Sequence, residues 1–270
     1  MEMKKYYLSV ASIFKNESWG MKEWLDHYKF HGIDHIYLIN DFSTDDYQSI
    51  LQPYIDDQFV TLYQNDIIER YTGRQIDMNN KFFKPIFKDS QWLANVDLDE
   101  YLYSPKIVNL KEILCKYESY AGVIANWVWF NSNNHIKQPP IIVAGFTKRC
   151  DYDERVYMKP PGLSPEWVQF NAPKLILNSS FDVHSFETHT AITSGNMINI
   201  STQGMPNDPD LLINHYQLQS REYWEKIKMN RGDVNHWFKG SPRDFAGYES
   251  MDIGDIEDLR LWKQNIKINR

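Results

Sequence analysis

The sequence predicts an α/β protein with a mostly parallel sheet, and two observations support this prediction. Strand and helix patterns alternate over the first third of the chain, which is typical of parallel strands joined by right-handed crossovers. An apolar run that begins at Trp92 then ends in three carboxylates within four positions, Asp97, Asp99 and Glu100. In such sheets ligands bind beyond the carboxyl ends of the strands, so we expect the functional site there.

The first strand is expected over Tyr6–Phe14, because this run is apolar and too short to span a membrane. Ser18 has the residue type that caps a helix, and the apolar positions that follow it recur at helical spacing until Gly32. The next expected elements are a strand over His35–Ile39, a helix over Asp45–Leu51 stopped by Pro53, a strand over Val60–Tyr63 and a helix over Gly73–Ser90 with Pro85 as a kink or early stop.

The pattern changes after Tyr103 and predicts a mixed β region followed by C-terminal helices. Pro and Asn clusters separate two β-rich runs, which favours a hairpin or a mixed-sheet extension. The expected elements are a helix over Asn109–Tyr117, strands over Val123–Phe130, Ile141–Arg149, Lys174–Leu177 and Phe181–Phe186, loops over Lys159–Pro165 and Ser194–Pro209, and helices over Gln219–Arg231 and Ile253–Ile266.

Length and composition predict one domain. The chain has 270 residues, 42% of them hydrophobic, which is enough for a substantial core. We expect a single domain over residues 1–270, with a nucleotide-binding half over 1–103, an acceptor half over 104–217 and helices over 218–270.

Charge and cysteine content limit the classes of function and the cellular compartment that we expect. The net charge of −7 argues against a nucleic-acid-binding surface, because phosphate backbones are held mainly by clustered Lys and Arg. Cys115 and Cys150 form neither a disulfide framework nor a CxxC metal pair, which favours a reducing compartment. With no signal peptide and no integral membrane segment in the sequence, we expect a cytoplasmic protein.

The acidic cluster after Trp92 predicts a metal and diphosphate site. If the strand continues through this stretch, its alternation points Asp97 and Asp99 to the same side. Mg²⁺ and Mn²⁺ prefer oxygen ligands and are commonly held by one or two carboxylates together with substrate phosphates. The alternative is a strand end whose acids are simply solvated.

Five motifs, in order, carry a resemblance to a known family. They are Lys15-Asn16-Glu17; Glu23-Trp24-Leu25 with His31–Tyr37; Asn40–Asp45; Trp92–Tyr101; and Ile213–Tyr216 followed by Ser220, Lys226 and Arg231-Gly232. From about Val10 to Asp233 the chain resembles GT-A-fold glycosyltransferases related to families 92 and 2. The resemblance implies a GT-A, Rossmann-like sheet, a nucleotide-sugar donor with UDP as the nucleotide, Mn²⁺ or Mg²⁺, a glycan or other hydroxyl acceptor, and inversion at the anomeric carbon.

The same resemblance implies roles for individual residues in binding the donor. Asp41 is similar to the acid that accepts a hydrogen bond from the nucleoside base, and Asn16 and Glu17 are weaker candidates of that kind. An ordinary helix cap is the alternative for Asp41. Lys226 and Arg231 would neutralise the leaving diphosphate, unless they belong to a solvated helix face.

By the same resemblance, His215 joins Asp97 and Asp99 as a metal ligand, and Asp97 thereby also contacts the donor. A hydrogen-bonded core histidine is the alternative for His215. His184 competes for the ligand role or would donate to the diphosphate.

An inverting transfer also needs a general base near the acceptor hydroxyl. Glu166 is the first candidate for this catalytic role, because Trp167 beside it could stack on a sugar ring; Asp182 and Glu187 are the alternatives. Trp127 and Trp129 would face one side of a strand, either as an acceptor platform or as core.

Two other functions are weighed against a transferase. A haloacid-dehalogenase-like phosphohydrolase also pairs an Asp-x-Asp strand with Mg²⁺, and Asp255 and Asp258 resemble its later acidic motif. However, its Asp-x-Asp stands near the N-terminus, and Gly254 here lacks the apolar strand that should precede it. A non-catalytic protein that binds sugar nucleotides or glycans is the second alternative, and intact Asp97, Asp99 and His215 argue against it.

Overall fold

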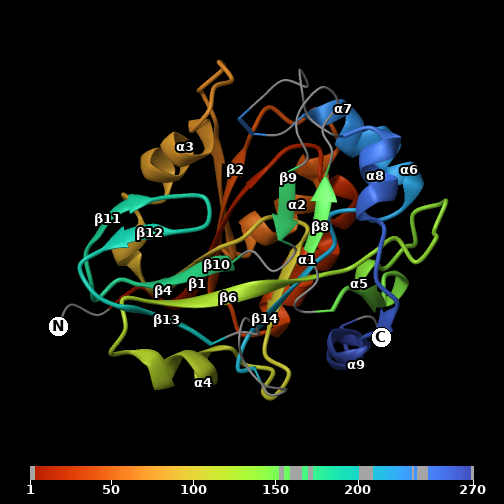
Figure 1. Cartoon of the computed structure of the whole chain (residues 1–270). Coiled ribbons are helices and arrows are strands. Elements are labelled where there is room, and N and C mark those ends of the chain that lie inside the picture. Colours follow the sequence, from red (N-terminus) through yellow and green to blue (C-terminus); the bar gives the residue numbers. More distant parts are fainter. Residues whose placement is uncertain are drawn as a thin grey trace.

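A mixed β-sheet with helices around it forms the protein (Figure 1). The structure is a computed structural model that describes residues 4–151, 155–158, 166–169, 173–200, 209–232, 234–235 and 243–268, with the backbone alone for 155–158 and 166–169. Among these residues, no helix is both long enough and apolar enough to cross a membrane.

The N-terminal half of the sheet is parallel, as the alternating pattern predicts. Its strands are β1 (Tyr6–Phe14), β2 (His35–Asn40), β3 (Val60–Gln64) and β4 (Ser90–Asn95), in the order β3-β2-β1-β4. Helices α1 (Ser18–Phe30) and α2 (Tyr47–Asp56) connect the first three. The carboxyl ends of β1, β2 and β4 therefore lie at one edge, which brings the polar segments that follow them together.

The other half of the sheet is mixed, which confirms the predicted change of pattern after Tyr103. Strand β10 (Pro173–Asn178) lies antiparallel between β4 and β6 (Gly122–Trp129). Strand β14 (Leu212–His215) lies parallel to β6 and antiparallel to β5 (Glu100–Tyr103), and β13 (Met197–Asn199) also pairs with β6. This arrangement, with its curled mixed sheet and surrounding helices, confirms the predicted α/β fold class with a mixed β region after Tyr103.

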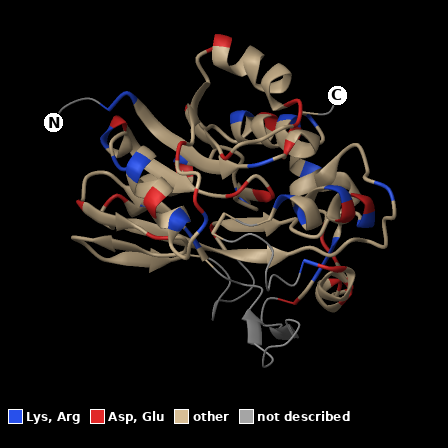
Figure 2. Ribbon diagram, turned by 90° about the horizontal axis from the view of Figure 1, so that it is seen from above, with Lys and Arg blue, Asp and Glu red and all other residues tan. Residues whose placement is uncertain are grey.

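The remaining described elements are short. The strand pairs are β7 (Lys148–Arg149) with β15 (Ile256–Glu257), β8 (Arg155–Met158) with β9 (Glu166–Gln169), and β11 (Val183–Phe186) with β12 (Ala191–Thr193). The helical turns are α3 (Arg74–Phe82), η1 (Phe87–Asp89), α4 (Lys111–Leu114), η2 (Cys115–Tyr117), α5 (Ile142–Gly145), α6 (Arg221–Tyr223), the π-helical η3 (Trp224–Lys228), α7 (Met229–Arg231), α8 (Phe245–Met251) and α9 (Arg260–Asn265). Lys and Arg are interspersed with Asp and Glu over these elements (Figure 2).

Several predicted boundaries are wrong, and each has a local cause. Pro53 lies inside α2 instead of stopping it; it is exposed, so water can satisfy the helix carbonyl that a proline leaves without a partner. The Ile141–Arg149 run is not one strand, because the carboxylate of Glu23 accepts the N–H groups of Ile142 and Val143 and thereby caps the helical turn α5.

Two further corrections concern helix starts. Ser18 is the first residue of α1 rather than its side-chain cap, and its N–H donates to the carboxylate of Asp45 at 2.8 Å. The predicted C-terminal helix begins at Arg260 rather than Ile253, because β15 occupies part of that stretch and pairs with β7. The predicted helix over Gly73–Ser90 is also divided, into α3 and η1.

Candidate active site

A cleft of about 260 Å³ opens at the carboxyl edge of the sheet. It lies beside the ends of β1 and β2, the turn after β4, the β11–β12 hairpin, the end of β14 and the end of α7. Seven of the candidate residues singled out from the sequence line it together: Glu17, Asp41, Asp97, Asp99, Trp127, His215 and Arg231. Glu17, Asp41, Asp97 and Asp99 were expected there from the strand-end rule, and His215 and Arg231 from the family resemblance. Glu17 and Arg231 are 214 positions apart in the chain and meet in this cavity.

The acidic residues lie in a turn rather than on a strand, which corrects the expected alternation. Strand β4 ends at Asn95, and β5 begins at Glu100. The indole of Trp24 donates to the carbonyls of Asp97 and Glu100, at 3.1 and 3.0 Å, and the N–H of Asp97 donates to the Glu100 carboxylate at 2.9 Å. These buried contacts, and not strand geometry, direct Asp97 and Asp99 into the cleft.

Asp99 is held between a lysine and a histidine. Its Oδ2 accepts from the Lys228 ammonium at 2.5 Å, and its Oδ1 lies 3.6 Å from His215 Nε2. Burial alone would raise the pKa of Asp99, but attraction to Lys228 and the contact with His215 outweigh it and hold this pKa well below its usual value. Asp99 is therefore ionised at neutral pH.

Asp97 is paired with the second buried lysine of the site. Lys174, on β10, donates to Asp97 Oδ2 at 2.9 Å and lies 3.6 Å from Glu100 Oε1. Burial alone would lower the pKa of Lys174, but Asp97 and Glu100 raise it overall. Burial raises the pKa of Glu100 well above its usual value, so Lys174 mainly compensates Asp97, whose side chain is still 38% exposed.

His215 is fixed by aromatic rings. It ends β14, and its ring centre lies 4.2 Å from that of Trp127 and 5.2 Å from that of Trp129. Its Nδ1 is buried without a hydrogen-bond partner among the described residues. Trp127 also faces His189 and Lys174 and lines the cleft, whereas Trp129 packs in the core with Trp224 and Tyr248. Both tryptophans therefore support His215; Trp129 belongs to the core, and the platform role considered from the sequence stays a prediction for Trp127 alone.

The donor set of this cleft suits a divalent cation. One ligand atom each of Asp99, Glu100 and His215 lies within 4.8 Å of the others. Two carboxylates and an imidazole are ligands that Mn²⁺ accepts, and His215 can meet an ion on the Oδ1 side of Asp99 while Lys228 remains on Oδ2. The geometric group contains Glu100 where the sequence predicts Asp97, because Lys174 holds Asp97.

A contact between Glu17 and Arg231 connects the N-terminal and C-terminal parts of the chain at the cleft. Arg231 donates to the carboxylate of Glu17 and, at 3.0 Å, to the carbonyl of Lys15, while the Tyr223 hydroxyl donates to Glu17 at 2.6 Å. Asn16 does not line the cleft; it adopts a positive φ of 52°, and its side chain accepts the N–H of Thr44 at 2.8 Å. Asn16 thus connects the loops that follow β1 and β2.

Asp41 follows β2 and is bound by cations. Arg74 donates to both of its carboxylate oxygens, at 2.5 and 3.1 Å, Arg70 lies 3.0 Å away, and Asn65 donates at 2.8 Å. Burial alone would raise the pKa of Asp41, but the hydrogen bond from Arg74 and the charge of Arg70 lower it overall. These four nitrogen atoms, from Arg74, Arg70 and Asn65, occupy the Asp41 carboxylate. An N–H group of a nucleoside base would therefore have to compete with them for Asp41.

The lysine that reaches Asp99 in the cleft is Lys228 and not the predicted Lys226. Lys226 pairs with Glu222 on the surface at 2.8 Å and does not line the cleft. The helix widens to a π-turn over Trp224–Lys228, and Lys228 reaches Asp99 from there. π-Turns of this kind often occur at functional sites. The sequence analysis missed Lys228 and Lys174, because neither stands in a motif and their partners are distant in sequence.

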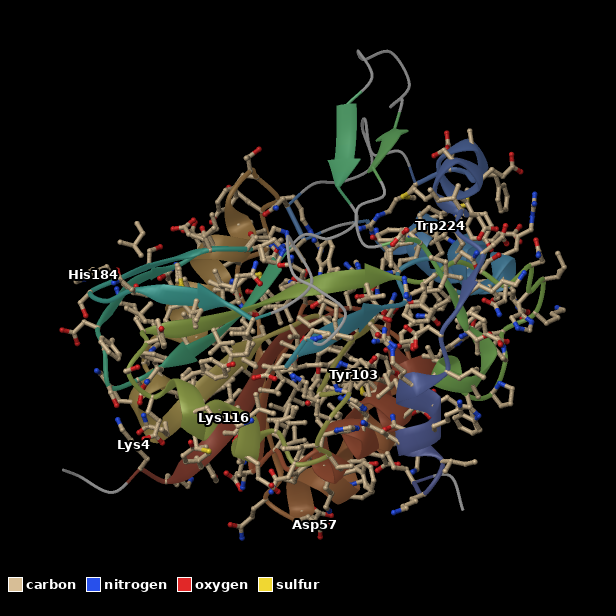
Figure 3. All side chains as sticks on the ribbon, turned by 60° about the horizontal axis from the view of Figure 1, so that its bottom comes forward. Lys4, Asp57, Tyr103, Lys116, His184 and Trp224 are labelled. Carbon is tan, nitrogen blue, oxygen red and sulfur yellow. The ribbon has the colours of Figure 1, made fainter. Side chains whose placement is uncertain are left out.

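The predicted alternatives for other roles lie elsewhere. His184 is exposed on β11 and lies at the outer edge of the molecule (Figure 3), whereas His189, which the sequence analysis did not single out, lines the cleft. Asp182 pairs with Lys88 at the surface, and Glu187 accepts from Ser185. Glu166 lies on β9, and its side chain is outside the described part of the structure.

Comparison with known proteins identifies the family. Residues 4–258 match the family described as glycosyltransferase family 92. The chain belongs to glycosyltransferase family 92. The match covers nearly the whole chain and confirms the resemblance read from the motifs, and with it the class of enzyme: a glycosyltransferase. No curated protein matches the chain.

Solved structures that resemble this family 92 protein are distant. TarS of S. aureus in complex with UDP is 14% identical over 64% of this chain, with a TM-score of 0.40, and the match spans 47% of the TarS chain. TarS residues 1–349 in complex with UDP-GlcNAc is 12% identical over 97% of this chain and 71% of that one, with a TM-score of 0.46. HddC from Yersinia pseudotuberculosis is 11% identical over 73% and 90% of the two chains, with a TM-score of 0.38.

Proposed function

We propose that this family 92 enzyme transfers a sugar from a UDP-sugar donor to a hydroxyl acceptor, such as a glycan, with a divalent cation and with inversion at the anomeric carbon. The observation that carries the proposal is the meeting of Asp97, Asp99 and His215 with Arg231 and Lys228 in one cleft. Acids and an imidazole suit a metal ion, and the neighbouring cations suit the phosphates that the ion would share.

The donor would lie along the cleft with its nucleoside toward the ends of β1 and β2. Asp41, with Arg70 and Arg74, forms that end of the cleft. Glu17 and Arg231 form a second ion pair in the same cleft. We assign UDP to this site because the family resemblance implies it. Arg231 and Lys228 would neutralise the diphosphate as its charge grows, which lowers the barrier because both side chains are already fixed by buried partners.

Mn²⁺ or Mg²⁺ would be held by Asp99 and His215, with Asp97 as the third ligand or as a contact to the ion through water. When bound, such an ion supplies charge stabilisation to the leaving diphosphate. The residues of the chain hold these ligands in position. Trp127 and Trp129 orient His215, and Trp24 holds the acidic turn in place.

In an inverting transfer the acceptor hydroxyl attacks the anomeric carbon from the face opposite the diphosphate, while a base removes its proton. The sequence predicts Glu166 for that role, and this stays a prediction. An α-linked UDP-sugar should then give a β-linked product, because a single displacement reverses the configuration.

The direct test is UDP release from a panel of UDP-glucose, UDP-galactose and UDP-N-acetylglucosamine, with and without Mn²⁺, with water or methanol as the simple acceptor. The methyl glycoside is then examined by NMR. We expect metal-dependent UDP release and a β-glycoside. A retained α-configuration would contradict a single displacement, and release of inorganic phosphate from small phosphate esters would instead favour the phosphohydrolase. Asp258, which that alternative requires, pairs with Arg149 and Arg260 and is absent from the cleft lining.

A further inference from the structure

His189 stands at the tip of the β11–β12 hairpin, between Phe186 and Ala191, and lines the same cleft as Asp97, Asp99 and His215. The hairpin tip is firmly attached. The amide side chain of Asn80, on α3, exchanges two hydrogen bonds with the backbone of Phe186, each of 3.1 Å, and Phe186 is buried against Phe87. A side chain carried by this tip therefore has a fixed position in the cleft.

The hydrogen bond of His189 fixes which ring nitrogen carries the proton. Nδ1 lies 3.0 Å from the carbonyl oxygen of Pro173. A carbonyl oxygen can only accept, so Nδ1 carries the hydrogen and donates it, and in the neutral ring Nε2 keeps a free lone pair. Nε2 has no hydrogen-bond partner among the described residues. Burial and the nearby Lys174 lower the pKa of His189, which favours the neutral ring.

The acids that line the described part of the cleft are poorly suited to remove a proton. Glu17 is bound by Arg231 and Tyr223, and Asp41 by Arg70, Arg74 and Asn65. Asp97 and Asp99 are each paired with a buried lysine. A carboxylate stabilised by a cation is a weaker base, because protonation breaks that attraction. The ring of His215 faces Asp99 on one side and is enclosed on the other.

We infer that His189 is the catalytic base of the transfer, in place of Glu166. This inference rests on the proposed function and adds a named base to it. The acceptor hydroxyl gives its proton to Nε2 as a lone pair of the oxygen forms the bond to the anomeric carbon. The bond from that carbon to the diphosphate breaks at the same time, and its electron pair leaves with UDP. Pro173 stabilises the resulting imidazolium through Nδ1–H.

The test compares His189→Gln with His184→Gln, an exposed histidine of the same hairpin that lies outside the cleft. Both variants are assayed for UDP affinity and for UDP release from the UDP-sugar of the panel that the wild-type protein turns over fastest. We expect His184→Gln to match wild type. His189→Gln should keep UDP affinity within about threefold and lose roughly 100-fold or more of its turnover, which is the scale of a general base.

A second variant separates chemistry from structure. In His189→Gly, added imidazole should restore part of the lost turnover, because a free base can enter the space that the side chain leaves. The inference is wrong if UDP affinity falls in step with turnover, if imidazole restores nothing, or if Glu166→Gln loses turnover while His189→Gln keeps it. If the wild-type protein turns over none of the UDP-sugars, the proposed function fails and the inference fails with it.

Discussion

Lys228 donates to Asp99 at 2.5 Å, and the two side chains are only 2% and 6% exposed. The pair joins the π-turn of the C-terminal part to the acidic turn after β4, 129 positions away in the sequence. Removing the cation paired with a buried carboxylate is strongly destabilising, whereas a divalent ion at the same carboxylate can take over that compensation. If the cleft holds the proposed metal ion, this pair therefore predicts that stability and metal binding are linked.

Lys228→Met should therefore lower the free energy of unfolding of the metal-free protein by about 3–5 kcal/mol, the cost typical of breaking a buried pair. Mn²⁺ should recover more of the melting temperature in this variant than in wild type. Lys226→Met is the matched control, because Lys226 is exposed and contacts Glu222 and the Trp19 ring at the surface. Equal melting temperatures of the two variants, with and without Mn²⁺, would show that the pair contributes nothing.

Asp99→Asn and Asp97→Asn should both remove the Mn²⁺ dependence of UDP binding, measured by titration calorimetry. They should differ in stability. Asp99→Asn neutralises a carboxylate that is 6% exposed and leaves Lys228 buried without it, whereas the Asp97 side chain is 38% exposed. We expect the larger loss in denaturant unfolding for Asp99→Asn. Unchanged Mn²⁺-dependent UDP affinity in both variants would remove these acids from the site.

His215→Ala should weaken Mn²⁺ affinity by roughly 10–100-fold, with the loss typical of mutated outer-shell partners taken as a lower guide for a ligand. The side chain is held by two tryptophan rings, so Ala also leaves a gap, and melting temperature must be measured alongside. His215→Gln, which fills more of that gap, is the control for packing. A lower melting temperature with unchanged Mn²⁺ affinity would make His215 a structural residue.

The pKa of Asp41 is lowered in the folded state, so its ionised form favours folding. This contribution is present above the unfolded-state pKa of about 3.9 and is lost as the pH falls through the lower folded-state value. Asp41→Asn should thus be clearly less stable than wild type at pH 7, and the difference should shrink below about pH 4. Urea unfolding across this pH range measures it. A difference that stays constant with pH would show that the charge of Asp41 is irrelevant to folding.

Local patterns predict much of the fold because the relevant signals are short-range. Strand β1 has the predicted bounds, and β2 and β3 extend one residue beyond theirs, since apolar runs between polar turns determine them. The start of α5 was not predictable in this way. It depends on capping by Glu23, which is 119 positions from Ile142, and no local pattern contains that contact.

The same distinction between local patterns and long-range contacts applies to the residues of the site. Asp41 and Asp97 follow the ends of β2 and β4, and the rule that ligands bind there brings them together without any knowledge of side-chain contacts. His215 was expected only from the family resemblance. Lys174 lies within a strand and Lys228 within an irregular helix, so only the folded chain reveals their partners. His189 follows β11, which belongs to a separate antiparallel pair, so the strand-end rule does not select it and only the folded chain places it in the cleft.

The central claim is that the cleft binds a UDP-sugar together with a divalent cation. The measurement that tests it most directly is the melting temperature of the wild-type protein with each UDP-sugar of the panel, in Mn²⁺ and in EDTA. A ligand at a hundred times its dissociation constant adds about 2.7 kcal/mol to the free energy of unfolding. We predict a rise for at least one UDP-sugar in Mn²⁺ and a much smaller one in EDTA. No rise with any UDP-sugar, or an equal rise without metal, would contradict the account.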